Sequence, residues 1–294
     1  MEDIFMQHNY VAFSQADVFS QIPYQGNPVA VIIDGDKFSD DEMQKIANWT
    51  NLSETTFLCS PTNPAADYRL RIFTPKEELS FAGHPTIGSA KVALNNGLKP
   101  QHSEYLVQEC TKGLVPVYMK QDKLFFALPK PDVKPISSDL LEAIAQALGL
   151  PNIDSIKLAK VVDVGAVWYT LYLDTVETVL SLNPDDRQLA SLLPKGTSGV
   201  TVFALTDGKT EVEVRSFAPA QGVHEDPVCG SGNGAVAVLV KEEQLLGNSH
   251  YLASQGQKCG RSGLIEVDLD NQGQILIGGQ AVECIKGRIT LPER

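Results

Sequence analysis

The sequence contains a weak internal repeat with a period close to half its length of 294 residues. In the clearest pair, Arg71-Ile-Phe73-Thr-Pro75 recurs 144 residues later as Arg215-Ser-Phe217-Ala-Pro219. The other pairs, at offsets of 145 to 147, are Asp40-Asp41 with Asp185-Asp186, Thr55-Thr-Phe57 with Thr201-Val-Phe203, Gly83 with Gly230, Ala90 with Ala237, and Tyr105-Leu106 with Tyr251-Leu252. A repeat of this kind predicts one fold that occurs twice. The alternative is chance similarity between two β-rich halves.

The joint between the two copies is predicted at a proline-rich segment, Pro129-Lys-Pro131-Asp-Val-Lys-Pro135. The first copy then covers residues 1–128 and the second covers residues 129–294. The last strand of the chain can cross back to the first copy, so its assignment to the second copy is open.

Local patterns predict short strands and a few helices in each copy. Runs of β-branched and apolar residues predict strands at residues 27–33, 54–59, 68–73, 105–110, 114–119, 123–128, 166–173, 200–205, 211–217, 265–269 and 274–277. Ser39-Asp-Asp-Glu42 is a capping box that opens a helix to about Trp49. Asn183, followed by Pro184, is the predicted cap of another helix, and a helix at 138–148 is expected to end at Gly149.

In each copy, one segment is predicted to form a helix at the centre. Residues 235–240, Ala-Val-Ala-Val-Leu-Val, are apolar on every side, so a helix there is expected to be buried all round. Residues 84–94 are rich in small residues, which allow surrounding backbone to come close. Both features fit a central helix wrapped by a strongly curved antiparallel sheet. The predicted fold class is therefore α+β, and a doubly wound parallel sheet is not expected because neither copy alternates strands and helices regularly.

Composition narrows the functional classes. The net charge of −12 argues against a nucleic-acid partner, which requires a basic footprint, but permits an anionic small molecule. No cysteine or histidine cluster has metal-ligand spacing, so no metal is expected. The scattered cysteines are expected to be free thiols in a reducing compartment: Cys59, Cys110, Cys229, Cys259 and Cys284. The N-terminal Met-Glu-Asp-Ile-Phe has no apolar signal core, and no apolar run is long enough to span a bilayer, so a cytoplasmic location without membrane association is expected.

Three segments carry the candidate chemistry. Glu54 opens a predicted apolar strand, where a carboxylate is either a solvated strand end or a group held at a cleft. Residues 81–88 and 224–234 are glycine-containing loops at equivalent places in the repeat, and each enters a helix. Helix N-termini bind anions, so two facing copies would clamp a carboxylate between them. Each loop by itself also fits a tight turn without a ligand.

A carboxyl side chain beside a bound carboxylate can have a raised pKa and exchange a proton with carbon. Donors that clamp the substrate would stabilise the enolate-like charge that develops. The arrangement predicts an isomerase or epimerase that acts next to a carboxylate and needs no cofactor.

The motifs together resemble the phenazine-biosynthesis PhzF-like isomerase family. The matching segments are Asp17-Val-Phe19, Gly26-Asn-Pro-Val-Ala-Val31, Ser53-Glu54-Thr-Thr-Phe57, Arg71-Ile-Phe-Thr-Pro75, Gly83-His84-Pro85-Thr86, Glu225-Asp226-Pro227-Val and Gly230-Ser231-Gly232. The resemblance implies the diaminopimelate epimerase-like fold, with two similar β-barrel domains each around a central helix, the active site between them, and a homodimer. It also implies a hydrogen shift on a small carboxylic acid, with one Glu as base and acid.

Position by position, the resemblance makes Glu54 the catalytic carboxylate, with His84, Asp226 and Ser231 as supporting polar residues. The neighbouring loop residues are the predicted substrate-binding set: Gly83, Pro85, Thr86, Cys229, Gly230 and Gly232.

Cys229 separates two related mechanisms. Diaminopimelate epimerase uses two cysteines, one before each glycine-rich helix start, whereas this sequence has Cys229 at one such place and Ala82 at the other. One thiol alone favours single-Glu chemistry, and Cys229 is expected to pack and shape the helix start. A two-base epimerase or racemase that uses Cys229 and Glu54 is the alternative.

Three further hypotheses are weaker. Gly230-Ser-Gly232-Asn-Gly-Ala235 fits a dinucleotide-binding fingerprint but follows no clean central strand. Cys229 at a helix N-terminus could be a nucleophile. A non-catalytic binding protein could also retain this scaffold. The sequence does not identify the substrate.

Overall fold

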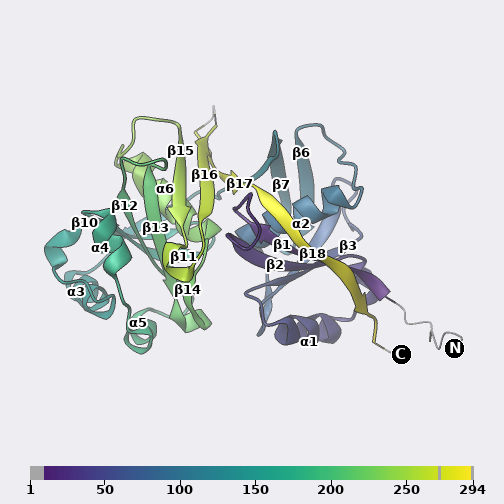
Figure 1. The fold of residues 1–294 in the computed structure, drawn as a ribbon, viewed down its shortest axis with the longest axis horizontal. Helices are drawn as coiled ribbons and strands as arrows, with labels where there is room; N and C mark the ends of the chain where they lie inside the picture. The colour runs from purple at the N-terminus through teal and green to yellow at the C-terminus, as the bar shows by residue number, and fades with distance from the viewer. Residues whose placement is uncertain (1–9, 271–272, 293–294) are drawn as a thin grey trace, which may run out of the picture. The chain divides into compact units, whose positions relative to one another are not determined.

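The computed structural model describes residues 10–270 and 273–292, so the N-terminal Met-Glu-Asp-Ile-Phe lies outside the described residues. The chain forms two compact units, which Figure 1 shows. Unit 1 contains the described residues up to Tyr24, Pro28–Phe126, and those from Gln280 onward. Unit 2 contains Gln25–Asn27 and Ala127–Gly279.

The elements of unit 1 include each predicted strand and helix of the first copy, together with three strands that were not predicted, at 10–18, 78–79 and 281–290. The elements of this unit are β1 (Tyr10–Val18), β2 (Asn27–Ile32), the 3-10 helix η1 (Gly35–Lys37), α1 (Asp40–Thr50), β3 (Thr55–Cys59), β4 (Tyr68–Phe73), β5 (Glu78–Leu79), α2 (Gly83–Asn95), β6 (Tyr105–Cys110), β7 (Gly113–Lys120), β8 (Lys123–Ala127) and β18 (Ala281–Thr290). The chain crosses back at its end, because β18 pairs antiparallel with β1 in unit 1.

Unit 2 has a similar series with additional helices. Its elements are β9 (Asp132–Pro135), α3 (Ser138–Ala147), η2 (Ile153–Ser155), β10 (Ile156–Asp163), β11 (Val167–Leu173), α4 (Val176–Ser181), α5 (Asp186–Leu192), β12 (Thr197–Leu205), β13 (Val212–Ala218), η3 (Pro219–Gln221), β14 (Val223–Asp226), α6 (Gly230–Glu242), β15 (His250–Gln255), η4 (Gln257–Cys259), β16 (Gly263–Leu269) and β17 (Ile275–Gly279). The proline-rich joint is not a bare linker, since β9 forms within it and pairs antiparallel with β10.

The two units share one order of strand pairing. In unit 1, β2 and β3 are parallel, β3 and β4 antiparallel, β4 and β6 parallel, and β6 and β7 antiparallel. In unit 2 the same sequence of orientations joins β11, β12, β13, β15 and β16. Most pairings in each unit are antiparallel, as the sequence predicts.

A helix of 13 residues lies at the centre of each unit. Helix α2 contacts β1, β3, β4, β7 and β18, and α6 contacts β10, β11, β12, β16 and β17. Every residue of α6 from Gly232 to Val240 is buried, which confirms the predicted all-round burial. At Gly88 of α2, a Cβ atom would lie 2.5 Å from the Val29 side chain, so the small residues do allow close packing.

Two predictions about helix starts have different outcomes. The capping box is confirmed: the Ser39 hydroxyl accepts the Glu42 N–H, and the Glu42 carboxylate accepts the Ser39 N–H. The predicted cap at Asn183 is wrong, because Asp185 caps α5 by accepting the Gln188 N–H at 3.0 Å. The intervening proline keeps residue 183 in a non-helical conformation, and the helix starts three residues later.

The register of β3 corrects one pair of the repeat. Phe57 lies opposite Arg71, whereas Val202 lies opposite Arg215, so the equivalent of Phe57 is Val202 and not Phe203. A slip of one residue moves a side chain to the other face of a sheet. Accordingly, Phe57 packs edge-on against Phe73, whereas Phe203 stacks on Tyr172.

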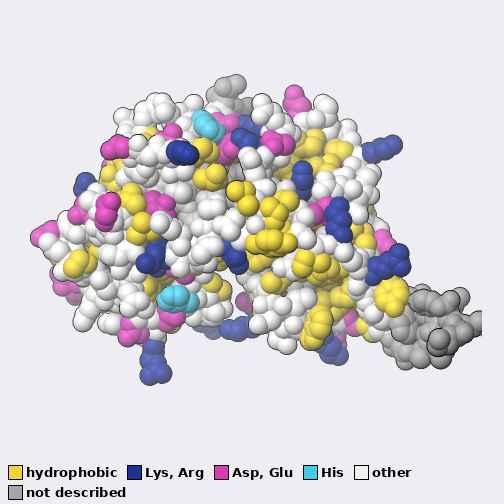
Figure 2. All heavy atoms as spheres, viewed as in Figure 1, with side chains coloured by type: hydrophobic (Ala, Val, Ile, Leu, Met, Phe, Trp, Pro, Cys, Tyr) yellow, Lys and Arg dark blue, Asp and Glu magenta, His cyan; other side chains and the backbone are white. Residues whose placement is uncertain are grey.

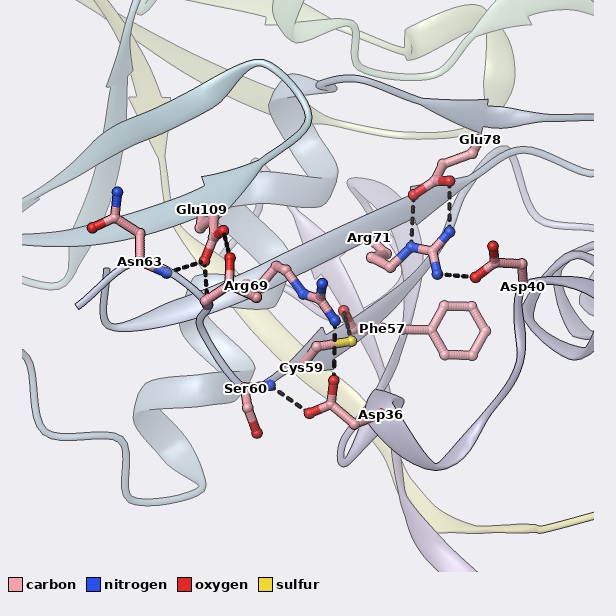
Figure 3. A network of polar contacts seen from close by, with 11 residues as sticks. Asp36, Asp40, Phe57, Cys59, Ser60, Asn63, Arg69, Arg71, Glu78 and Glu109 are labelled. Carbon is pink, nitrogen blue, oxygen red and sulfur yellow. Dashed lines mark hydrogen bonds and ion pairs between the residues drawn. The ribbon is translucent and has the colours of Figure 1, made fainter. Parts of the chain in front are cut away.

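The strongest pair of the repeat marks a duplicated ion pair. Arg71 donates two hydrogen bonds to Glu78, at 2.8 and 2.7 Å, and also contacts Asp40, as Figure 3 shows. Arg215 binds Glu225 in the same bidentate way, at 3.0 and 2.7 Å. Each guanidinium lies over the phenylalanine two residues further on, at 5.1 and 4.8 Å from the ring centre. The Arg-x-Phe motif is therefore a structural feature of each unit, and it involves none of the predicted site residues.

Candidate active site

Glu54 and His84 lie together in unit 1. Glu54 is the residue before β3, not its first residue, and its carbonyl accepts the Ala30 N–H at 3.4 Å. Its side chain is 16% exposed, and that of His84, the second residue of α2, is 7% exposed. Glu54 Oε2 lies 3.2 Å from His84 Nε2, although the two atoms do not have the geometry of a full hydrogen bond. The structure thus brings together the two predicted catalytic residues of the first copy.

Burial raises the pKa of Glu54 to about 7, against an opposing effect from its hydrogen bond with Ser53. Removal from water disfavours the charged carboxylate because the surrounding protein solvates it poorly. A carboxyl group with such a pKa is present in both protonation states near neutral pH. It can therefore accept a proton in one step and return it in the next.

The other predicted residues at the start of α2 mainly shape the helix. Thr86 donates its N–H to the Ala82 carbonyl at 3.2 Å, and its buried hydroxyl accepts from Gln108 Nε2 at 3.1 Å. Gly83 is required by packing, since a Cβ atom there would lie 2.7 Å from the Phe126 ring. Pro85 is buried and has no N–H, so neither it nor Thr86 offers a backbone donor to a ligand.

Asp226 organises the loop that leads into α6 in unit 2. Its Oδ1 accepts hydrogen bonds from Asn27 Nδ2 at 2.9 Å and from the Val228 N–H at 3.1 Å. Its backbone carbonyl accepts from Gln255 Nε2 at 2.8 Å. These contacts make the loop a defined structure with a buried polar network beneath it.

Cys229 is the N-cap residue of α6. Its Sγ accepts the Gly232 N–H at 3.2 Å, and its carbonyl accepts the Asn233 N–H at 3.0 Å. The side chain is buried, and burial raises the pKa of its thiol well above the ordinary value. A neutral, buried thiol that caps a helix is a poor general base. Gly230 and Ser231 carry the other two N–H groups of the first turn.

Ser231 occupies the same place in α6 as His84 does in α2, the second position of the helix. Its Oγ accepts a hydrogen bond from the Trp168 indole N–H at 3.1 Å. Because the indole only donates, the hydrogen of the Ser231 hydroxyl is left for another acceptor, and Cys229 Sγ lies 3.6 Å from this oxygen. Gly232 is required by packing, since a Cβ atom there would lie 2.5 Å from Ser216 Oγ.

Sequence reasoning missed the residues that hold the second loop in place. Asn27 lies inside a motif that the sequence analysis quotes, but no role was assigned to it. No local sequence pattern marks Trp168 or Gln255, because their partners are distant in sequence. Trp168 contacts Ser231, 63 residues away, and Gln255 contacts residues 226, 229 and 233, which are 22 to 29 residues away.

The described part of the chain contains no group of three or more His, Cys, Asp or Glu side chains that could hold a metal ion. Within the same residues, no helix combines the length and apolar character needed to cross a membrane. On the face shown in Figure 2, Lys and Arg side chains are scattered among Asp and Glu and do not form one basic patch.

Comparison with known proteins identifies the family. The family described as "Phenazine biosynthesis-like protein" matches residues 16–287. A Schizosaccharomyces pombe protein named Antisense-enhancing sequence 1 is 41% identical, over 94% of this chain and 98% of that protein. The trans-2,3-dihydro-3-hydroxyanthranilate isomerase of Pseudomonas aeruginosa is 31% identical, over 97% of this chain and 100% of the enzyme.

Solved structures agree on the fold. A PhzF-family protein of Bacillus anthracis superposes with a TM-score of 0.84 at 22% identity, covering 96% of this chain and 99% of its own. One from Enterococcus faecalis gives 0.78 at 27% identity, covering 96% and 100%. A hydroxyproline epimerase of Agrobacterium vitis shares the fold more distantly, with a TM-score of 0.63 at 14% identity over 97% and 93% of the two chains. The chain therefore belongs to the phenazine biosynthesis-like PhzF family and is an isomerase with the diaminopimelate epimerase-like fold.

Proposed function

We propose that this isomerase moves a proton on carbon next to the carboxylate of a small organic acid, with Glu54 as its acid–base group. The observation that carries the proposal is the position of Glu54, whose side chain is 16% exposed, has a pKa raised to about 7 and lies 3.2 Å from His84. Acid–base catalysis is most effective when the pKa of the catalytic group lies near the working pH.

In the proposed reaction, the Glu54 carboxylate takes a proton from a carbon atom of the substrate. The electron pair of the broken C–H bond moves into the adjoining π system, and the protonated Glu54 then returns the proton to another carbon. No net proton or electron is gained or lost. His84 holds the carboxyl group in one orientation through its contact with Oε2.

The N-terminus of α6 supplies the proposed carboxylate-binding group. The N–H groups of Gly230 and Ser231 lie at the positive end of the helix dipole. The Ser231 hydroxyl, which already accepts from Trp168, can donate its own hydrogen to a substrate oxygen. Both groups can bind the carboxylate of a small organic acid.

One relative whose name states its activity suggests the substrate class. Because the Pseudomonas aeruginosa relative is named for trans-2,3-dihydro-3-hydroxyanthranilate, a cyclic amino acid with a carboxylate on the ring is the proposed class. A two-base epimerase that uses Cys229 is less well supported, since burial keeps that thiol protonated.

The test follows deuterium from solvent into product. Trans-2,3-dihydro-3-hydroxyanthranilate is incubated in D2O with wild type, Glu54→Gln, or the control Glu77→Gln, which removes an exposed carboxylate of unit 1. We expect Glu54→Gln to lose about 10²–10⁴-fold in kcat, while binding of anthranilate, measured by calorimetry, persists. Wild-type turnover in Glu54→Gln would remove this residue from the mechanism. An inactive wild type would refute the proposed substrate class.

A further inference from the structure

Gln255 joins three points of the loop and helix that form the proposed carboxylate-binding group. Its side chain lies at the end of β15 and is 2% exposed. Oε1 accepts from the Cys229 N–H at 3.1 Å and from Asn233 Nδ2 at 2.7 Å. Nε2 donates to the Asp226 carbonyl at 2.8 Å. One buried amide thus fixes both ends of the loop from Asp226 to Cys229.

The backbone determines the orientation of this amide. The Cys229 N–H can only donate and the Asp226 carbonyl can only accept, so Oε1 has to face the former and Nε2 the latter. Neither group can change its role. Position 255 therefore requires a side chain that accepts on one side and donates on the other.

Unit 1 contains a related glutamine whose hydrogen-bond partners do not fix the orientation of its amide. Gln108 is fully buried on β6, the corresponding strand, and its Nε2 donates to the hydroxyl of Thr86 at 3.1 Å. Its Oε1 accepts from the hydroxyl of Tyr68 at 3.2 Å. Thr86 is the fourth residue of α2, just as Asn233 is the fourth residue of α6. Both partners of Gln108 are hydroxyl groups, which can either donate or accept.

We propose that Gln255 is a positioning residue that holds the Asp226–Cys229 loop so that the first N–H groups of α6 bind the substrate carboxylate. This inference rests on the proposed function. The amide acts through the backbone of the loop, and the groups it positions are the N–H groups of Gly230 and Ser231. The Gln108 amide binds two side-chain hydroxyl groups, those of Thr86 and Tyr68, and has no such effect on a loop backbone.

The chemistry of the two sites distinguishes Gln255→Glu from Gln108→Glu. A protonated glutamic acid at position 255 can still accept through its carbonyl and donate through its hydroxyl. An ionised one has no hydrogen to give to the Asp226 carbonyl and repels it. At position 108, both hydroxyl partners can donate to an ionised carboxylate. The defect of Gln255→Glu should therefore grow as the pH rises, and the defect of Gln108→Glu should change much less.

The kinetic test compares wild type, Gln255→Glu and Gln108→Glu from pH 5 to 9 with trans-2,3-dihydro-3-hydroxyanthranilate. Each variant's kcat and KM are divided by the wild-type values at the same pH, so that the effect of Glu54 titration cancels. We expect KM of Gln255→Glu to rise about tenfold relative to wild type at pH 8.5, the effect of one hydrogen bond lost at a charged group. The ratio should approach one as the pH falls, and kcat should change less than KM. Ratios that are flat with pH, or equal for the two variants, would overturn the inference.

A second measurement does not depend on activity. Amide hydrogen exchange of residues 226–232, corrected for intrinsic rates, should be faster in Gln255→Glu than in wild type at pH 8.5 and similar at pH 5. Gln255→Met, which has a similar volume but no such hydrogen bonds, should show faster exchange at every pH. It replaces Gln255→Glu in this measurement if that variant does not fold. If wild type fails to turn over the probe, the proposed function is wrong, and exchange still decides the role of Gln255. Unchanged exchange in both variants would refute that role.

Discussion

Replacement of Glu54 by Gln should stabilise the protein at alkaline pH while it removes activity. In the unfolded chain the carboxyl group titrates near 4.5, whereas burial raises its pKa in the folded protein to about 7. Between these values the folded state holds the proton more tightly than the unfolded state. The free energy of unfolding of wild type therefore falls as pH rises through this range, whereas the neutral amide of the variant is unaffected.

The expected size of this stabilisation follows from the same two pKa values. Each tenfold change in an acid constant corresponds to about 1.4 kcal/mol, so a pKa moved from 4.5 to about 7 corresponds to about 3 kcal/mol. Glu54→Gln should match wild type near pH 4 and be more stable by up to about 3 kcal/mol at pH 8.5. The side chain is only 16% exposed, so solvent screening reduces this value little.

Urea unfolding at a series of pH values, followed by far-UV circular dichroism, measures this difference. Glu77→Gln is the control, because it makes the same substitution at an exposed carboxylate of unit 1. A stability difference for Glu54→Gln that stays flat from pH 4 to 8.5 would refute the reasoning. A variant less stable than wild type at pH 8.5 would show that contact with His84 stabilises the ionised carboxylate more than burial destabilises it.

Three further predictions concern unit 2 and its counterpart in unit 1. Cys229→Ser should keep kcat within about threefold of wild type in steady-state assays, because oxygen also accepts an N-cap hydrogen bond. Trp168→Phe should lower kcat/KM about fivefold through loss of the roughly 1 kcal/mol bond to Ser231, and unchanged kinetics would contradict this. Arg215→Met should cost about 3–5 kcal/mol in urea unfolding, because its carboxylate partner is only 4% exposed, whereas Arg71→Met, with more exposed partners, should cost about 1 kcal/mol.

Much of the fold could be predicted because its signals are local. The capping box at Ser39 and the glycine-led starts of α2 and α6 depend on residues a few positions apart, and the structure has them where the sequence places them. The apolar run in α6 predicts burial on all sides, since such a helix cannot face water on any side. Glu54 and His84 also stood out as polar residues in apolar or glycine-containing surroundings.

The features that could not be predicted depend on contacts between residues that are distant in sequence. Asn27 and Asp226 are separated by 199 residues, and their hydrogen bond exists only because residues 25–27 join unit 2. The pairing of β18 with β1 joins the two ends of the described chain. Strand register decides such contacts, and the misaligned Phe203 shows that similarity between two strands does not reveal a shift of one residue.

The corrected register also explains why the Glu54 carboxylate has no counterpart in unit 2. With Phe57 equivalent to Val202, the counterpart of Glu54 is Gly199. A Cβ atom at Gly199 would lie 2.0 Å from the Phe217 carbonyl oxygen and 2.9 Å from the Trp168 ring, so unit 2 has no space for a side chain there. The indole instead donates to Ser231, the counterpart of His84. Divergence between the two copies thus left a carboxylate beside a histidine in unit 1 and, at the corresponding place in unit 2, a hydroxyl group held by an indole.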